Sequence, residues 1–349
     1  MVAIDQTRQR LGQGLVIPAC PLALTAQRAW DERRQRALFR YYLAAGAGGL
    51  AVGVHTTQFA IHDPQVGLLR PVLEIGAEEM SRASTVVRIA GLCGSTQQAL
   101  AEASCARDLG YDAGLLSLGA WKTGAERDLI AHCRIIGEVI PIIGFYLQPA
   151  AGGRVLSYAF WRQLAELERL VAIKIAPFNR YQTLDVVRAV VEARRDDIAL
   201  YTGNDDNIIA DLLTPFRFAV DGQMVERRMV GGLLGHWAVW TRKAVELHGE
   251  CRRLAQSGES IPVSLLQQAI EVTDANAAFF DPAHGFAGCI AGIHEILRRQ
   301  GLFEGIWCLD PQETLSPGQK EEIDRVCQAY PHLSDDEFVR QHLDQWLLG

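Results

Sequence analysis

Short apolar runs alternate with longer amphipathic stretches along the first two thirds of the chain. The runs are rich in Val, Ile, Leu and Ala and are flanked by Gly, Pro or polar residues, which is typical of strands. Their continuous apolar character favours a parallel sheet that is covered on both faces. The predicted strands are Leu15–Ala19, Leu50–Val54, Val86–Ala90, Ala113–Ser117, Pro141–Phe145, Leu170–Ile175, Ile198–Thr202 and Val230–Leu234.

Helical patterns lie between these runs, at Asp31–Ala45, Thr96–Leu109, Ala125–Val139 and Thr183–Arg194. Eight strand–helix repeats in about 250 residues is the arithmetic of a (β/α)₈ barrel. An open doubly wound sheet is the alternative, but no GxGxxG motif follows the first strand. The pattern therefore predicts an α/β fold of the TIM-barrel type.

Strand patterns stop after about residue 258. The predicted helices beyond that point are Ser264–Ala278, Gly285–Gln300, Pro317–Tyr330 and Asp335–Leu348. We therefore expect a catalytic barrel over residues 1–258 and a C-terminal helical extension, packed on the barrel, over residues 259–349. The stretch Leu212–Met229 is longer than a usual connection between a helix and a strand, which indicates an inserted excursion before the last strand.

Composition and charge exclude several classes of protein. Hydrophobic residues make up 49% and charged residues 21%, which is a globular balance. The net charge of −7 disfavours nucleic acid as a partner. No apolar run reaches the ~18 residues that span a bilayer, and the polar N-terminus does not resemble a signal peptide. We expect a cytoplasmic protein without a membrane partner, whose eight scattered cysteines are buried thiols.

One lysine has an unusual setting. Of the 34 basic residues only four are lysines, and Lys174 lies inside the apolar run LVAIKIAPF. Burial lowers the pKa of an amine, and a neutral amine is the nucleophile that forms a Schiff base with a ketone. The alternatives are a lysine paired with a buried carboxylate and one that extends out of the strand end. We favour catalysis by Lys174.

Hydroxyl groups follow two other predicted strands. Tyr146 ends the fifth strand, where a phenol next to Lys174 can shuttle protons; a half-buried tyrosine with a satisfied hydroxyl is the alternative. Thr56 and Thr57 follow the second strand and can hold a carboxylate together with nearby backbone N–H groups. Ordinary turn chemistry explains two threonines at a loop start at least as well.

Acidic and histidine side chains follow further strands. Asp205 and Asp206 open the stretch after the seventh strand, where helix capping is the favoured interpretation and a metal site the weaker one. His55 and His236 lie at strand ends and are candidates for substrate contact. Neither histidine belongs to an HxH or HxxxH pair, so we predict no zinc site.

Several motifs together resemble the dihydrodipicolinate synthase and N-acetylneuraminate lyase family of class I aldolases, over about residues 14 to 330. They are GLVIPACPLALT, GVHTTQF at the position of a Gly-Thr-Thr-Gly-Glu loop, PIIGFYLQP, VAIKIAP, YTGNDDN and LRRQGLFEGIWCLDPQETLSP. The resemblance implies a homotetramer and a small-molecule 2-oxo acid such as pyruvate as substrate.

The resemblance also implies roles for single residues. Lys174 would form the imine, Tyr146 would shuttle protons, and Thr56 would belong to its hydroxyl relay. Thr57, with its backbone, would bind the carboxylate of the oxo acid, and Gly203 would help shape that pocket. No metal or organic cofactor is implied, because the lysine imine is itself the electron sink.

Three segments depart from the family pattern. Gln58 and Phe59 stand in place of Gly-Glu, residues 118–121 (LGAW) in place of a Pro-Tyr-Tyr segment, and residues 150–152 (AAG) in place of Gly-Arg-Thr. Arg154 is too far along the chain to be assumed to bind a second substrate's carboxylate. These changes argue against the dihydrodipicolinate synthase reaction itself.

The sequence thus predicts a carbon–carbon lyase that acts on a 2-oxo acid through Lys174. A Schiff-base dehydratase of a keto-deoxy sugar acid, a non-catalytic 2-oxo-acid-binding relative, and a metal-dependent enzyme using Asp205, Asp206 and His236 are the alternatives.

Overall fold

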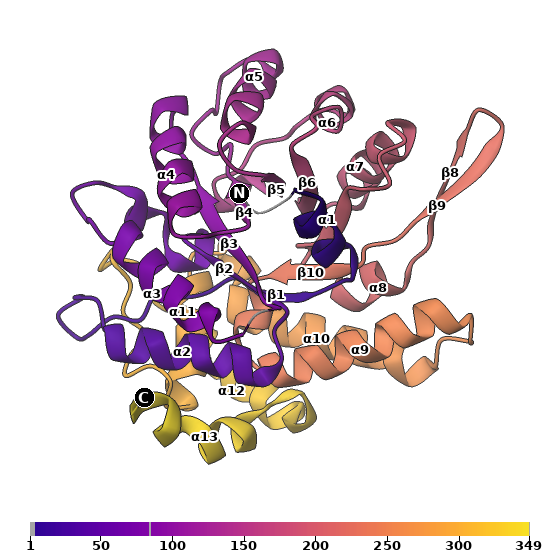
Figure 1. Ribbon diagram of the computed structural model, residues 1–349. Coiled ribbons are helices and arrows are strands. Elements are labelled where there is room, and N and C mark those ends of the chain that lie inside the picture. The colour runs from indigo at the N-terminus through magenta and orange to yellow at the C-terminus, as the bar shows by residue number, and fades with distance from the viewer. Residues whose placement is uncertain (1–3, 84, 349) are drawn as a thin grey trace.

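The structure is a computed structural model that describes residues 4–83 and 85–348. Eight parallel strands form one sheet in the order β1-β10-β7-β6-β5-β4-β3-β2, surrounded by helices (Figure 1). The strands are β1 (Val16–Pro18), β2 (Gly49–Val52), β3 (Val87–Leu92), β4 (Ala113–Leu116), β5 (Ile142–Leu147), β6 (Leu170–Ala176), β7 (Ala199–Thr202) and β10 (Gly231–Leu234). Each overlaps one predicted run, because uninterrupted apolar segments are buried on both faces.

β1 and β2 stand at the two ends of this strand order, and contacts between them close the sheet into a barrel. Val16 pairs with Gly232 on one side of β1, and a parallel bridge joins Ala19 to Ala51 on the other. The N–H of Cys20 donates to the carbonyl of Ala51 at 2.9 Å. The predicted (β/α)₈ barrel is therefore confirmed.

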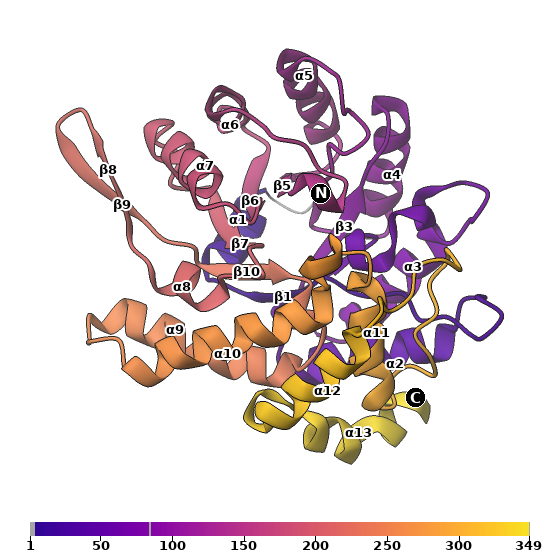
Figure 2. The same cartoon turned by 180° about the vertical axis from the view of Figure 1, so that it is seen from behind.

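Helices cover the outside of the barrel (Figures 1 and 2). They are α2 (Glu32–Ala45), α3 (Leu69–Ser81), α4 (Thr96–Asp108), α5 (Glu126–Gly137), α6 (Tyr158–Leu164), α7 (Arg180–Glu192), α8 (Ile208–Leu213) and α9 (Thr241–Ser257). Local chemistry sets their ends: the Asp31 carboxylate accepts the Arg34 N–H at 3.0 Å, and Gly46 ends α2 with φ of 96°.

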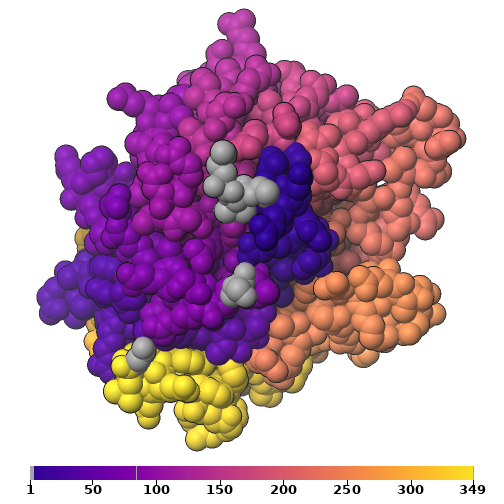
Figure 3. Space-filling view, in the orientation of Figure 1, coloured from indigo at the N-terminus to yellow at the C-terminus, as the bar shows by residue number. Residues whose placement is uncertain are grey.

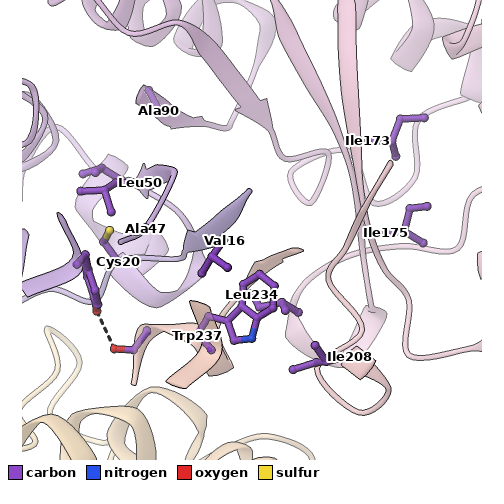
Figure 4. Packing of buried hydrophobic residues seen from close by; sticks show 14 of the residues in the cluster. Val16, Cys20, Ala47, Leu50, Ala90, Ile173, Ile175, Ile208, Leu234 and Trp237 are labelled. Atoms are coloured by element: carbon purple, nitrogen blue, oxygen red, sulfur yellow. Dashed lines mark hydrogen bonds between the residues drawn. The ribbon is translucent and has the colours of Figure 1, made fainter. Parts of the chain in front are cut away.

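The core has an inner and an outer layer. Inside the barrel lie small and branched side chains such as Ile17, Ala51 and Leu115. Between the strands and helices lies a larger layer, in which Val16, Leu234 and Trp237 pack together (Figure 4).

A helix that the sequence did not reveal closes one end of the barrel. α1 (Ile4–Gly12) contacts β3, β6 and β7, and it forms the indigo surface of Figure 3. Its Leu11 is fully buried among the inner-layer residues, and the Tyr201 hydroxyl donates to the Leu11 carbonyl at 2.7 Å. The helix has a polar outer face and only nine residues, so its sequence pattern was weak.

The predicted excursion is a two-stranded hairpin of β8 (Phe216–Val220) and β9 (Gln223–Arg227). The C-terminal helices are α10 (Val263–Phe280), α11 (Cys289–Arg299), α12 (Gln319–Ala329) and α13 (Asp336–Leu348). α10 contacts α8, and α13 contacts α2, so this part lies against the barrel helices (Figure 2). The boundary at residue 258 stays a prediction. Within the described residues, no helix is long and apolar enough to cross a membrane.

Candidate active site

A small cavity of about 50 Å³ lies at the carboxyl ends of the barrel strands. It has room for roughly four water-sized groups, which suits a small organic acid. The barrel contributes to its wall Ala19, His55, Thr56, Phe145, Leu147, Gln148, Ala151, Lys174, Ala176, Phe178, Gly203, Asp205 and Gly235. Catalytic groups of this fold lie at the same end.

Lys174 points into the cavity from β6. It pairs in register with Phe145 of β5 and Tyr201 of β7, and its Nζ lies 4.6 Å from the centroid of the Phe145 ring. The side chain is 6% exposed, and burial lowers the pKa of its amine below the ordinary 10.5. A Cβ on Gly203 would lie 2.9 Å from Cε of Lys174, so glycine makes room for the lysine side chain.

Asp205 is the buried carboxyl group of the cavity. Burial raises the pKa of Asp205, whereas the N–H of His236, which donates to Oδ1 at 2.8 Å, and the charge of Lys174 act in the opposite direction. The prediction that Asp205 caps the following helix is wrong, because α8 begins only at Ile208 and the carboxylate binds the loop after β10 instead. Its place in the same cavity as Lys174 could not be predicted from the sequence, because the lysine lies in β6 and the carboxylate in the loop that follows β7.

The prediction that Tyr146 faces Lys174 is also wrong. Side chains alternate along a strand, and Phe145 takes the inward position. Tyr146 points outward, where its ring lies 5.0 Å from that of Trp161 on α6. Its hydroxyl is 3.3 Å from both the carbonyl and the N–H of Leu156. The alternative of a satisfied structural tyrosine therefore describes Tyr146.

The two threonines after β2 differ. Thr57 is fully buried, donates to the Cys20 carbonyl at 2.6 Å, and accepts the N–H groups of Gly53 and Val54 at 3.0 and 3.1 Å. Its hydroxyl is saturated by turn contacts, so the predicted side-chain contact with a carboxylate has no support. Thr56 does line the cavity, while its hydroxyl donates to the Ala19 carbonyl at 2.7 Å.

The two predicted histidines line different hollows of the molecule. His55 lines the cavity, and burial together with the charge of Lys174 lowers its pKa to about 4, which keeps the ring neutral. The ring of His236 stacks on Phe279 at 5.6 Å and lines a separate groove beside α9 and α10. His236 does not line the cavity; its backbone N–H donates a hydrogen bond to the carboxylate of Asp205, which does.

The C-terminal part completes the cavity wall with Phe280, Phe286 and Cys289. Phe286 packs edge-to-face on Phe178 at 5.7 Å, and both residues have positive φ, 70° and 51°. Strained backbone of this kind persists where the surroundings enforce it, often beside functional sites. None of these residues was among the candidates predicted from the sequence; the aromatic pair before Asp281 and the phenylalanine five residues after it were the available signal.

Comparisons with known proteins agree with this architecture. Residues 14–217 match the Dihydrodipicolinate synthetase family. The chain is 28% identical over 203 residues to 4-hydroxy-tetrahydrodipicolinate synthase of Bifidobacterium longum, covering 55% of this chain and 60% of that protein. It is 30% identical over 186 residues to the enzyme of the same name from Aromatoleum aromaticum, covering 52% of this chain and 61% of that protein. These matches therefore span about 60% of the length of the relatives.

Solved structures share the fold over nearly the whole chain. Dihydrodipicolinate synthase from Oceanobacillus iheyensis superposes with a TM-score of 0.75 at 20% identity, covering 95% of this chain and 100% of that one. YagE, an E. coli K12 prophage protein of the dihydrodipicolinic acid synthase family in complex with pyruvate, superposes with a TM-score of 0.74 at 16% identity. The match covers 91% of this chain and 98% of that one. CdNal from Clostridium difficile in complex with mannosamine superposes with a TM-score of 0.69 at 17% identity, covering 91% of this chain and 99% of that one.

Proposed function

The chain belongs to the Dihydrodipicolinate synthetase family, and from that premise we propose that it is a class I lyase that makes or breaks a carbon–carbon bond next to the carbonyl of a 2-oxo acid. The observation that carries the proposal is a buried lysine whose amine has a lowered pKa and opens into a cavity of small-acid size. We propose that it forms a homo-oligomer, as the resemblance implies, and that it works in the cytoplasm, as expected from the sequence.

Lys174 is the proposed nucleophile. Its neutral amine adds to the ketone carbon, and loss of water gives a protonated imine. The imine withdraws electrons from the neighbouring C–C or C–H bond, so that this bond can break with its electron pair delocalised as an enamine. The reverse sequence joins the enamine carbon to an acceptor carbonyl. No external electron acceptor is needed.

Asp205 is the proposed proton carrier in place of a phenol. It lines the same cavity as Lys174, and its raised pKa leaves a carboxyl group that both donates and accepts protons near neutrality. Protonated, Asp205 can supply the proton that lets the carbinolamine hydroxyl leave as water. Ionised, it can take the proton from the carbon next to the imine.

The carboxylate of the substrate needs hydrogen-bond donors on the cavity wall. Gln148 offers a side-chain amide, and the neutral His55 ring offers one N–H. We propose these two groups as the carboxylate contacts, with Thr56 beside them. The hydroxyl of Thr57 is excluded from that role by its three backbone contacts.

The dihydrodipicolinate synthase reaction itself fits poorly. Arg154 donates to the carbonyls of Trp121 and Gly124 at 2.5 and 2.9 Å, so it is committed to the loop after β4. We therefore propose a different second substrate or leaving fragment. A 2-oxo-acid-binding protein without turnover is the second candidate, and the apolar Phe145 beside Lys174 favours it.

Hydrogen–deuterium exchange at C3 of pyruvate in D₂O tests the lyase proposal. Exchange requires imine and enamine formation but no second substrate, and proton NMR follows loss of the methyl signal. We expect exchange with the native protein and with Lys243→Arg, a substitution at a half-exposed lysine of α9, and none with Lys174→Arg. A trapped Lys174 imine without exchange would identify the binding protein instead.

A further inference from the structure

A second cluster of reactive side chains lies outside the cavity, where the loops after β2 and β3 meet. His62 ends the short 3₁₀ turn Phe59–His62, Cys93 follows β3, and Glu102 lies on α4. One ligand atom of each lies within 4.8 Å of the others, and this is the single such group of three found among residues 4–83 and 85–348. We propose that His62, Cys93 and Glu102 bind one divalent transition-metal ion of the zinc type.

The donor set suits zinc. Thiolate, imidazole and carboxylate together are ligands of a borderline-soft ion and a poor set for Mg²⁺ or Ca²⁺. Ligand atoms on a tetrahedral zinc stand roughly 3–4 Å apart, so small side-chain movements bring these three into place. His62 and Glu102 are 6% and 7% exposed, unlike the loose acidic groups common on protein surfaces.

Contacts around the cluster orient its ligands. The Nε2 atom of His62 lies 2.7 Å from the Gly53 carbonyl, which fixes the proton there and directs Nδ1 toward Cys93 and Glu102. A backbone carbonyl behind a ligating imidazole is the usual arrangement at metal sites. Glu102 is held by the Cys93 N–H and by the Gln98 amide, each at 2.9 Å.

The Nδ1 atom of His62 has no satisfactory hydrogen-bond partner within the part of the chain that the structure describes. It lies 3.0 Å from Oε1 of Glu102, yet it makes no well-directed hydrogen bond and is buried. The buried Nδ1 atom thus faces the thiol of Cys93 and the carboxylate of Glu102 without a directed hydrogen bond, at the point that a metal ion would occupy.

Solvent supplies the fourth ligand. His62 and Cys93 border an open cleft of about 470 Å³, lined also by Phe59, Asp63 and Gly119. Three protein ligands with one position open to a cleft is the pattern of a zinc ion that holds a water molecule or a small ligand. Phe59 contacts both His62 and His55, so this site adjoins the cavity wall through one aromatic ring.

Metal binding to the tag-free protein tests the proposal. The protein is first freed of metal by a chelator and dialysis, and we then expect it to bind one equivalent of added Zn²⁺. Co²⁺ bound in its place should give an intense thiolate-to-metal charge-transfer band. Cys93→Ser and Glu102→Gln should weaken binding by more than about tenfold, and Cys93→Ser should abolish the band. Cys105→Ser, a substitution at a partly buried thiol that lies on α4 together with Glu102, should bind like the native protein.

A second measurement covers the case that the variants do not fold. In the native protein, bound Zn²⁺ should slow alkylation of Cys93 but not of Cys105, as mapped by peptide mass. Lys174→Arg should bind metal normally, so a failure of the lyase proposal leaves this one intact. Substoichiometric metal, no charge-transfer band and unprotected Cys93 would overturn the proposal and leave a His62–Glu102 ion pair.

Discussion

The Nζ atom of Lys174 lies 4.6 Å from the centroid of the Phe145 ring, across the pairing of β6 with β5. The position beside the nucleophile is therefore occupied by an aromatic face without a hydroxyl group. We therefore assign the proposed proton transfer in the cavity to Asp205, the one carboxyl group that lines it among the described residues.

Tyr146→Phe should leave isotope exchange within about twofold of the native rate, because the phenol points toward α6. Loss of its contacts with Leu156 should cost about 1 kcal/mol of unfolding free energy, measured by denaturant titration. Phe145→Tyr, which places a hydroxyl beside Lys174, is the complementary variant and should change the exchange rate. A hundredfold loss of exchange in Tyr146→Phe would show that the phenol reaches the cavity.

Imine formation should rise with pH as the Lys174 amine loses its proton. Because burial lowers that pKa, the midpoint should fall below 10.5. The Asp205 carboxylate stabilises the ammonium form, so Asp205→Asn should move the midpoint to lower pH while it slows exchange at C3. The rate of borohydride trapping against pH measures the midpoint. A midpoint that rises in Asp205→Asn would refute the proposed electrostatic coupling.

Gly203→Ala should misplace the nucleophile. Its Cβ would lie 2.7 Å from Cβ of Ala176 and 2.9 Å from Cε of Lys174. We expect trapping about 100-fold slower, since small displacements of a reacting group have such effects. Gly249→Ala on α9 is the control, because its Cβ would meet no atom within 4 Å. Equal trapping rates in the two variants would mean that Lys174 is not confined there.

Phe286→Ala should open the cavity on its C-terminal side. The variant removes the edge-to-face partner of Phe178, and we expect 2-oxo acids with bulkier side chains to gain about tenfold in trapping efficiency relative to pyruvate. Tyr181→Ala, which removes an aromatic ring that is 82% exposed on α7, should leave the ratio unchanged. An unaltered ratio in Phe286→Ala would place the specificity elsewhere.

The barrel could be predicted from the sequence because its strands are uninterrupted apolar runs, and β6 with its single lysine is the clearest of them. Which side chains point into the barrel could not be predicted in the same way. A shift of one residue reverses inside and outside, so the pair Phe145–Tyr146 decides which aromatic ring meets Lys174. The motif spacing alone favoured Tyr146.

Long-range contacts account for the other differences. Asp205 meets Lys174 only after β6 and β7 pair, and Phe286 comes from beyond the barrel altogether. Likewise, His62, Cys93 and Glu102 show no metal-ligand spacing along the chain, because three separate elements bring them together.

Borohydride trapping tests the central claim most directly. The protein is incubated with pyruvate and a panel of 2-oxo acids, reduced, and analysed by intact mass and peptide mapping. We predict a covalent adduct on Lys174 with at least one member of the panel and none with Lys174→Ala. Folded native protein that forms no adduct with any member of the panel would contradict the Schiff-base account.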